Sequence, residues 1–165
     1  MTKLVRLSSC AVFCALLAAP PGAAGDDSTP HTRACIEKAK GPYGFQCHGS
    51  AFNGAIFEPV TFVGTVEADD DAVYEGFGTF SSSNGSASTH VKGKATFGRH
   101  CFGHVDYTTN EILLPGGGTI PLPPAAFDFA VVDDGREILG TGVAAPGVTG
   151  DFVPRLTCRL VKIRR

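Results

Sequence analysis

A histidine and an aspartate two positions apart form the most chemically distinctive group in the sequence. His104 and Asp106 lie in the segment 101–109, whose residue types are those of an extended strand, and His100 stands just before it. Residues two apart on a strand share one face. A carboxylate beside an imidazole can orient it for acid–base chemistry or support it as a metal ligand. His104 and Asp106 are therefore the candidate catalytic residues.

The face that this pair occupies decides whether it can act. If Cys101 points outward to reach another cysteine, His104 and Asp106 point into the interior. Val105 and Tyr107 lie on the other side of the strand, and their apolar character favours the opposite arrangement, with His104 and Asp106 solvated on an outer wall. No nucleophile elbow, zinc-protease helix or phosphate loop accompanies the pair. The sequence therefore assigns no reaction.

Cysteine usage indicates an oxidising compartment. Two of the six cysteines, Cys10 and Cys14, lie in the apolar N-terminal region, and four remain in the rest of the chain: Cys35, Cys47, Cys101 and Cys158. An even number in an exported protein predicts two disulfides, which four cysteines can form in three ways. A zinc site is the competing interpretation. The wide spacing and the lack of a Cys-x-x-Cys pair disfavour it, and we expect no metal and no cofactor.

The N-terminus is typical of a secretory signal. Lys3 and Arg6 precede an apolar run at Ala11–Ala19, and small residues lead to a cleavage site expected near Gly25. The run is shorter than the ~20 residues that cross a bilayer, so we expect no stable membrane anchoring. Removal of residues 1–25 leaves 12 basic against 16 acidic residues with no basic stripe, which makes nucleic acid an unexpected partner. We expect a secreted or periplasmic protein.

The remaining chain predicts one all-β domain. Residues 26–40 form an N-terminal arm, loose over 26–33 with at most one helical turn at 35–40, and residues 41–165 form the β domain. Short β-branched and aromatic runs separated by turn residues predict eight strands: 43–49, 59–68, 72–82, 87–97, 101–109, 125–132, 137–144 and 155–163. Their short links favour antiparallel neighbours. We expect an eight-stranded up-and-down barrel, with a two-sheet sandwich as the alternative.

Sorting the strands by face predicts the disulfides. Cys47 lies on the apolar face of the first strand, and Cys158 lies on the apolar face of the last. Closure of a barrel makes these two strands neighbours, so Cys47 is expected to bond Cys158 across the seam. Cys35 is then left to bond Cys101, which ties the arm to the barrel wall.

The order of several short motifs resembles a family of small exported bacterial proteins. In this family a cysteine stands before a G-x-Y-x-F strand, followed by a P-(V/F)-x-x-V-G-x-(V/I) strand, a third strand with several glycines, a C-x-G strand and a late F-x-(V/I)-V-D-x-G-x-E-I segment. Here these are Cys35 with Gly41–Phe45, Pro59–Val66, Cys101–Gly103 and Phe129–Ile138. The resemblance implies a calycin-like barrel, similar to those of allene oxide cyclase and spirotetronate cyclase. Most members have no assigned function, so it implies no catalytic residue.

Three functions follow from a barrel of this kind. The first is non-catalytic binding of a small apolar ligand inside it, with a lining drawn from the inward phenylalanines: Phe45, Phe62, Phe77, Phe97, Phe127 and Phe129. The second is a cyclase or isomerase that uses His104 and Asp106 within the lumen. The third is a cell-surface or extracellular module that binds another protein, for which a filled core and either an exposed apolar patch or an accessible edge strand are expected.

Overall fold

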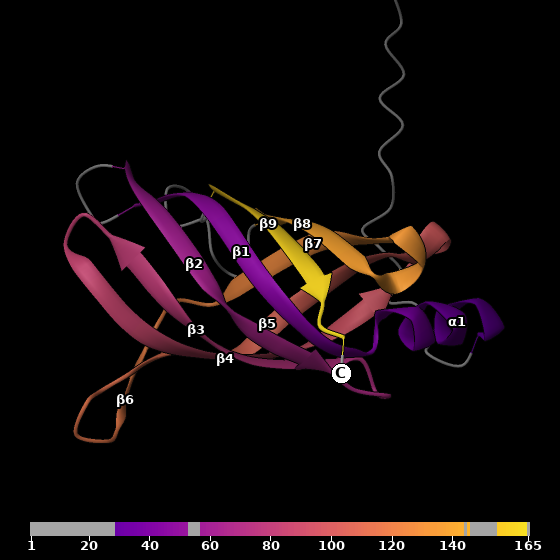
Figure 1. Ribbon diagram of the computed structural model, residues 1–165, viewed down its shortest axis with the longest axis horizontal. Helices are drawn as coiled ribbons and strands as arrows, with labels where there is room; N and C mark the ends of the chain where they lie inside the picture. The colour runs from indigo at the N-terminus through magenta and orange to yellow at the C-terminus, as the bar shows by residue number, and fades with distance from the viewer. Residues whose placement is uncertain (1–28, 53–56, 144, 146–154, 165) are drawn as a thin grey trace, which may run out of the picture.

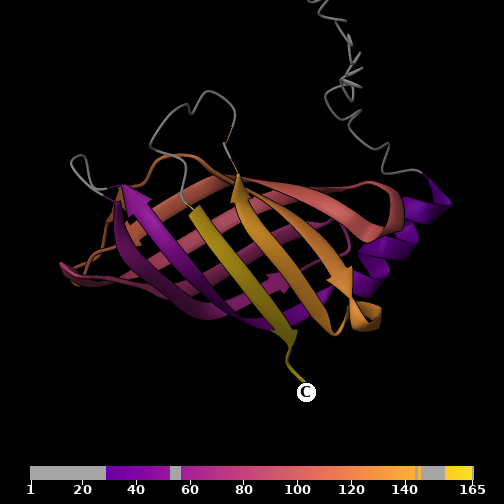
Figure 2. The ribbon, with the colours of Figure 1, turned by 90° about the horizontal axis from the view of Figure 1, so that it is seen from above.

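A closed barrel of eight antiparallel strands forms the body of the molecule (Figures 1 and 2). The structure, a computed structural model, describes residues 29–52, 57–143, 145 and 155–164. The expected signal segment and most of the connection at 144–154 lie outside these residues. The strands are β1 (Gly41–Phe52), β2 (Phe57–Ala68), β3 (Val73–Ser82), β4 (Gly85–Phe97), β5 (Phe102–Leu113), β6 (Thr119–Pro121), β7 (Ala125–Val132), β8 (Glu137–Val143) and β9 (Arg155–Lys162).

The strands follow one another around the barrel in chain order. β1 pairs with β2 and β9, β4 pairs with β5, and every pairing is antiparallel. β6 is an additional strand that pairs, among the described strands, with the end of β5 alone. The predicted fold class and all eight predicted strands are confirmed, and β7 has the predicted bounds. A two-sheet sandwich is excluded, because the first and last strands are hydrogen-bonded neighbours.

Both predicted disulfides are present. Cys47 of β1 lies directly opposite Cys158 of β9 in the strand register, with 4.0 Å between their Cα atoms. Their bond therefore joins the two chain ends of the barrel at the seam. Cys35 bonds Cys101 in the short 3₁₀ helix at Arg99–Cys101.

A helix covers one end of the barrel, where the sequence predicted a loose arm. α1 (Pro30–Ala39) begins after Thr29, whose hydroxyl accepts a hydrogen bond from the Thr32 backbone amide at 3.2 Å. The expectation of a tail over 26–33 is therefore wrong over its described part, because a Thr cap followed by proline is a helix start signal. Figure 1 shows α1 at one end and the β6 hairpin at the other.

α1 is fixed to the barrel by close packing. Its residues Cys35, Ile36 and Ala39 are buried in the larger of two core clusters. The Lys38 carbonyl lies so close to Gly135 that a Cβ there would be 2.1 Å from it. Gly135 ends the 3₁₀ turn Asp133–Gly135 between β7 and β8 and has a positive φ of 83°. Only glycine fits this contact between the helix and the turn.

A β-bulge changes the alternation of β5. Opposite β4, Lys92 pairs with Thr109 but the next residue, Gly93, pairs with Tyr107, so Thr108 is an extra residue. β5 continues to Leu113, beyond the predicted end at Thr109, and its end pairs with β6. A bulge inserts one residue and reverses which later side chains point inward. Tyr107, Asn110 and Ile112 consequently all line the interior.

Candidate functional site

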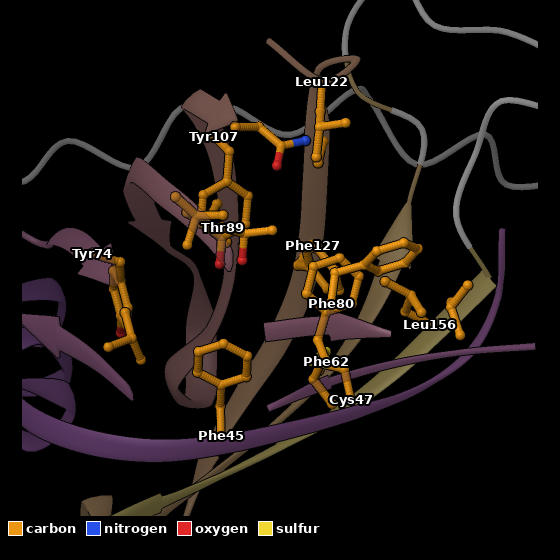
Figure 3. A pocket seen from close by; sticks show the side chains of 18 of the residues that line it. Phe45, Cys47, Phe62, Tyr74, Phe80, Thr89, Tyr107, Leu122, Phe127 and Leu156 are labelled. Carbon is orange, nitrogen blue, oxygen red and sulfur yellow. A yellow bond between two sulfur atoms is a disulfide. The ribbon is translucent and has the colours of Figure 1, made fainter. Parts of the chain in front are cut away.

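A cavity of about 340 Å³ occupies the part of the barrel away from α1 (Figure 3). Every barrel strand contributes to its wall, which is mainly aromatic and aliphatic. It is bounded toward α1 by the larger core cluster, to which Tyr74 and Phe129 belong. Small-molecule sites are commonly concave, apolar and supplied with a few polar groups. This cavity is therefore the candidate functional site.

Phe45 forms one wall of the cavity because the strands beneath it carry glycine. Gly64 of β2 pairs with Gly78 of β3, and a Cβ on either would come within 2.9 Å of the Phe45 ring. The ring therefore lies against bare backbone. A Cβ at either position would also lie closer still to the backbone of the paired strand, 2.3 Å from the Phe77 oxygen at Gly64 and 2.6 Å from the Val63 oxygen at Gly78, so glycine is required at both.

Two aromatic pairs form much of the remaining wall. The rings of Phe62 and Phe80 lie 4.8 Å apart, and those of Tyr107 and Phe127 lie 5.8 Å apart with their planes nearly perpendicular. In Figure 3, Phe62, Phe80 and Phe127 gather at one side and Tyr74 lies at the other. Aromatic walls offer large rigid contact areas to a flat or chain-like apolar ligand.

The structure places the six predicted lining phenylalanines in three different settings. Phe45, Phe62, Phe127 and Phe129 line the cavity. Phe77 does not, because it lies on the outer face with 54% of its surface exposed. Phe97 does not either, because it is 2% exposed in the core cluster beneath α1, edge-on to Phe129.

Phe80 is a lining residue that the sequence reasoning missed. It shares the inner face of β3 with Tyr74, Gly76 and Gly78, whereas Phe77 shares the outer face. The glycines of β3 indicate which face points inward. In a small barrel, large rings from other strands cover the face of a strand that carries glycine. Following Gly76 and Gly78 inward would have selected Phe80 in place of Phe77.

Three polar side chains reach the cavity near the end opposite α1. Glu58 of β2 accepts hydrogen bonds from the Ser83 hydroxyl and the Asn84 amide. Thr89 donates to the Gly78 carbonyl at 3.3 Å, and Asn110 donates to the Pro123 carbonyl at 2.8 Å. The wall at this end therefore differs from the rest of the cavity, because it includes a carboxyl group.

Tyr74 carries a buried hydroxyl for which the described residues supply no hydrogen-bond partner. Its side chain is 4% exposed, and burial raises the pKa of the hydroxyl well above its usual range, so it stays neutral. Tyr43 differs: its hydroxyl donates to the Gly135 carbonyl at 2.8 Å, and burial raises its pKa to about 12. An unpaired buried polar group destabilises the folded state.

We therefore expect Tyr74→Phe to raise the free energy of unfolding by about 1 kcal/mol, since the change removes an unpaired hydroxyl and keeps the ring. Urea denaturation followed by circular dichroism measures this. Tyr43→Phe is the matched control and should lose about 1 kcal/mol, because it leaves the Gly135 carbonyl without its donor. A loss of stability in Tyr74→Phe would show that a buried water or another group pairs with the hydroxyl.

His104 and Asp106 lie on the outer wall, as the apolar Val105 and Tyr107 favoured. The His104 side chain is 37% exposed and lines no part of the cavity, so the lumen-facing arrangement is wrong. Its ring nitrogens face Asp128 at 2.7 Å and Asp106 at 3.2 Å. Burial lowers the pKa of His104, but these two hydrogen bonds outweigh it, and the net shift is upward. Among the described residues, no group of three or more His, Cys, Asp or Glu side chains is arranged to hold a metal ion.

His90 is held between two carboxylates on the outer face. Its Nδ1 lies 2.9 Å from Glu111 and its Nε2 lies 3.0 Å from Glu75, while its ring stacks on Phe77 at 4.6 Å. The hydrogen bond to Glu111 is the largest cause of a raised pKa at His90, and the bond to Glu75 adds to it. Both ring nitrogens can donate only when the imidazole is protonated.

The raised pKa of His90 predicts a pH-dependent contribution to stability. A group whose pKa is higher in the folded state stabilises it fully below the unfolded pKa, near 6.5 for histidine, and loses this effect as pH rises through the folded value. The melting temperature of the wild type should therefore fall more between about pH 6 and about pH 8 than that of His90→Gln. Parallel curves for the two proteins would contradict this prediction.

No helix within the described residues is long and apolar enough to cross a membrane. Comparisons with protein-family models, with curated proteins and with solved structures give no match for this chain. The structure confirms the eight-stranded antiparallel barrel that the resemblance to small exported bacterial proteins implies. Membership of that family is not shown.

Proposed function

We propose that this protein is a non-catalytic exported barrel that binds one small, mainly apolar molecule inside its lumen. The observation that carries this proposal is the cavity of about 340 Å³, walled by Phe45, Phe62, Phe80 and Phe127. A packed core would leave no such space, because protein interiors rarely contain voids much larger than a water molecule.

The size of the cavity limits the ligand. An apolar cavity of roughly 150 Å³ takes one benzene molecule, so this one has room for two fused rings or a short branched chain. Transfer of such a molecule from water into an apolar site contributes about 25 cal/mol for each Å² of apolar surface buried. Apolar contact alone can therefore supply useful affinity.

Binding is favoured over catalysis by the position of the polar groups. His104 and Asp106, the candidate acid–base pair, face away from the cavity. Three polar side chains that line it, Glu58, Thr89 and Asn110, hydrogen-bond to other protein groups. A protein-binding module is less favoured, because it is expected to have a filled core, whereas this barrel contains a cavity.

Export is supported by the two disulfides, Cys35–Cys101 and Cys47–Cys158. Structural disulfides form and persist in oxidising compartments. Together with the signal-like N-terminus, they support a secreted or periplasmic location, where a small barrel can collect a ligand from its surroundings.

Titration with the neutral solvatochromic dye prodan tests the proposed function. The dye has two fused rings, and its emission shifts to the blue in an apolar site. We expect saturable binding of one dye per protein, with loss of the blue shift when the protein is unfolded in urea. Non-saturable binding, or no shift at any protein concentration, would overturn the proposal.

A further inference from the structure

We propose that the ligand is a small apolar amine whose ammonium group binds the carboxylate of Glu58. This inference rests on the proposed function and names the chemical class of the ligand. Its basis is a buried carboxylate on the cavity wall that has hydrogen-bond donors but no cationic partner among the described residues.

Glu58 points into the barrel at the end opposite α1. It is the second residue of β2, shares the inner face of that strand with Val60 and Phe62, and lines the cavity. Only 8% of its surface is exposed. Acidic residues are seldom this buried unless a charged or metal partner compensates them.

The described groups that hydrogen-bond to the Glu58 carboxylate are neutral. The Ser83 hydroxyl donates to Oε2, and the Asn84 side-chain amide lies 3.3 Å from Oε2 and 3.4 Å from Oε1. The ion pairs among the described residues do not include Glu58. Two side chains therefore orient its negative charge, and no cation in the described part of the chain balances it.

An ammonium group supplies what this site lacks. A buried charge is costly unless it is paired. A carboxylate has about four acceptor positions, and Ser83 and Asn84 occupy only part of them, mainly on Oε2. An ammonium group carries a positive charge and three donors, so it can bind Oε1 in a charge-assisted hydrogen bond.

The rings beside Glu58 suit the rest of such a ligand. Phe62 lies four residues along the same face of β2, in contact with Phe80 at 4.8 Å between ring centres. Aromatic faces attract cations and also pack against apolar groups. The unpaired hydroxyl of Tyr74 is a weaker anchor, because its oxygen is itself buried in the cluster beneath α1.

Glu58 also has a structural role, which the test must separate from ligand binding. Its hydrogen bonds to Ser83 and Asn84 hold the β3–β4 turn against β2. Glu58→Gln keeps an oxygen that accepts from Ser83 but removes the charge. Glu67→Gln is the matched control, since it makes the same charge change on the exposed side of the same strand.

Three indoles of similar size serve as probes: tryptamine is a cation at neutral pH, tryptophol is neutral, and indole-3-propionate is an anion. The chain contains three tyrosines and no tryptophan, so indole fluorescence can be read selectively at long excitation wavelengths. We expect tryptamine to bind at least about tenfold more tightly than tryptophol, and indole-3-propionate to bind most weakly. Glu58→Gln should remove the preference for tryptamine, and Glu67→Gln should retain it.

Equal affinity of the wild type for tryptamine and tryptophol would overturn the inference and leave the proposed function standing. A preference for tryptamine that survives in Glu58→Gln would also overturn it, because the charge would then act from elsewhere. If none of the three indoles binds, the inference fails, and prodan binding decides separately whether the cavity accepts any apolar ligand. A thermal melt of each variant confirms that it is folded.

Discussion

Replacement of Cys47 and Cys158 together by alanine is expected to lower the free energy of unfolding by roughly 4 kcal/mol. The bond between them joins β1 to β9, and 111 residues separate the two cysteines. A cross-link over so long a loop restricts the unfolded chain strongly, because the entropy of loop closure grows with the logarithm of loop length. Typical domains have only about 5–15 kcal/mol of stability, so this loss is a large part of the total.

Urea denaturation of the double variant against the wild type measures the effect. Cys35→Ala with Cys101→Ala is the comparison, since its loop spans 66 residues and joins α1 to the wall instead of closing the seam. The logarithmic dependence predicts similar losses for the two bonds, within about 1 kcal/mol. A loss below about 1 kcal/mol in the seam variant would show that strand pairing alone closes the barrel.

Ala125→Phe is expected to weaken prodan binding by at least about tenfold. Ala125 is the first residue of β7 and lines the cavity beside Phe127. A phenyl ring at this position fills lumen space that the ligand would otherwise occupy. The new ring enters an existing void and displaces no packed neighbour, so stability should change less than the 1–3 kcal/mol typical of overpacking a dense core.

Ala130→Phe provides the control for this experiment. Ala130 lies on the same strand but faces outward, opposite the exposed Phe102 in the β5–β7 register. It should bind prodan as the wild type does. If Ala125→Phe also binds normally while remaining folded, the dye lies elsewhere and the cavity is not the binding site.

The barrel and both disulfides could be predicted because period-two alternation survives in the terminal strands. Cys47 and Cys158 each lie on a face of apolar neighbours, and closure of the sheet follows from placing both faces inward. The helix was harder to predict, because its first turn contains His31 and Thr32, which have weak helix preference, and the Thr29–Pro30 start signal is its main local mark. Its stability comes from packing on the barrel end, which no local pattern shows.

The cavity could be predicted only in part, because its wall depends on contacts between distant strands. Alternation along β3 separates Phe77 from Phe80, but which of the two faces points inward is fixed by the Phe45 ring lying on Gly78. Asn110 and Ile112 reach the lumen through the bulge at Thr108, which depends on how β5 pairs with β4. Glu58 was not among the predicted site residues, because its setting depends on the β3–β4 turn, which places Ser83 and Asn84 beside it.

The helix at one end of the barrel has a consequence for how a ligand travels. α1 and the Cys35–Cys101 bond close that end, and the hydrogen-bonded strands close the sides. A ligand would then enter and leave the lumen through the opposite end, where Glu58 lies. A ligand would enter with its apolar part first and its charged group last, and would leave in the reverse order. The residence time of the ligand should therefore depend on how tightly its charged group is held at the open end of the barrel.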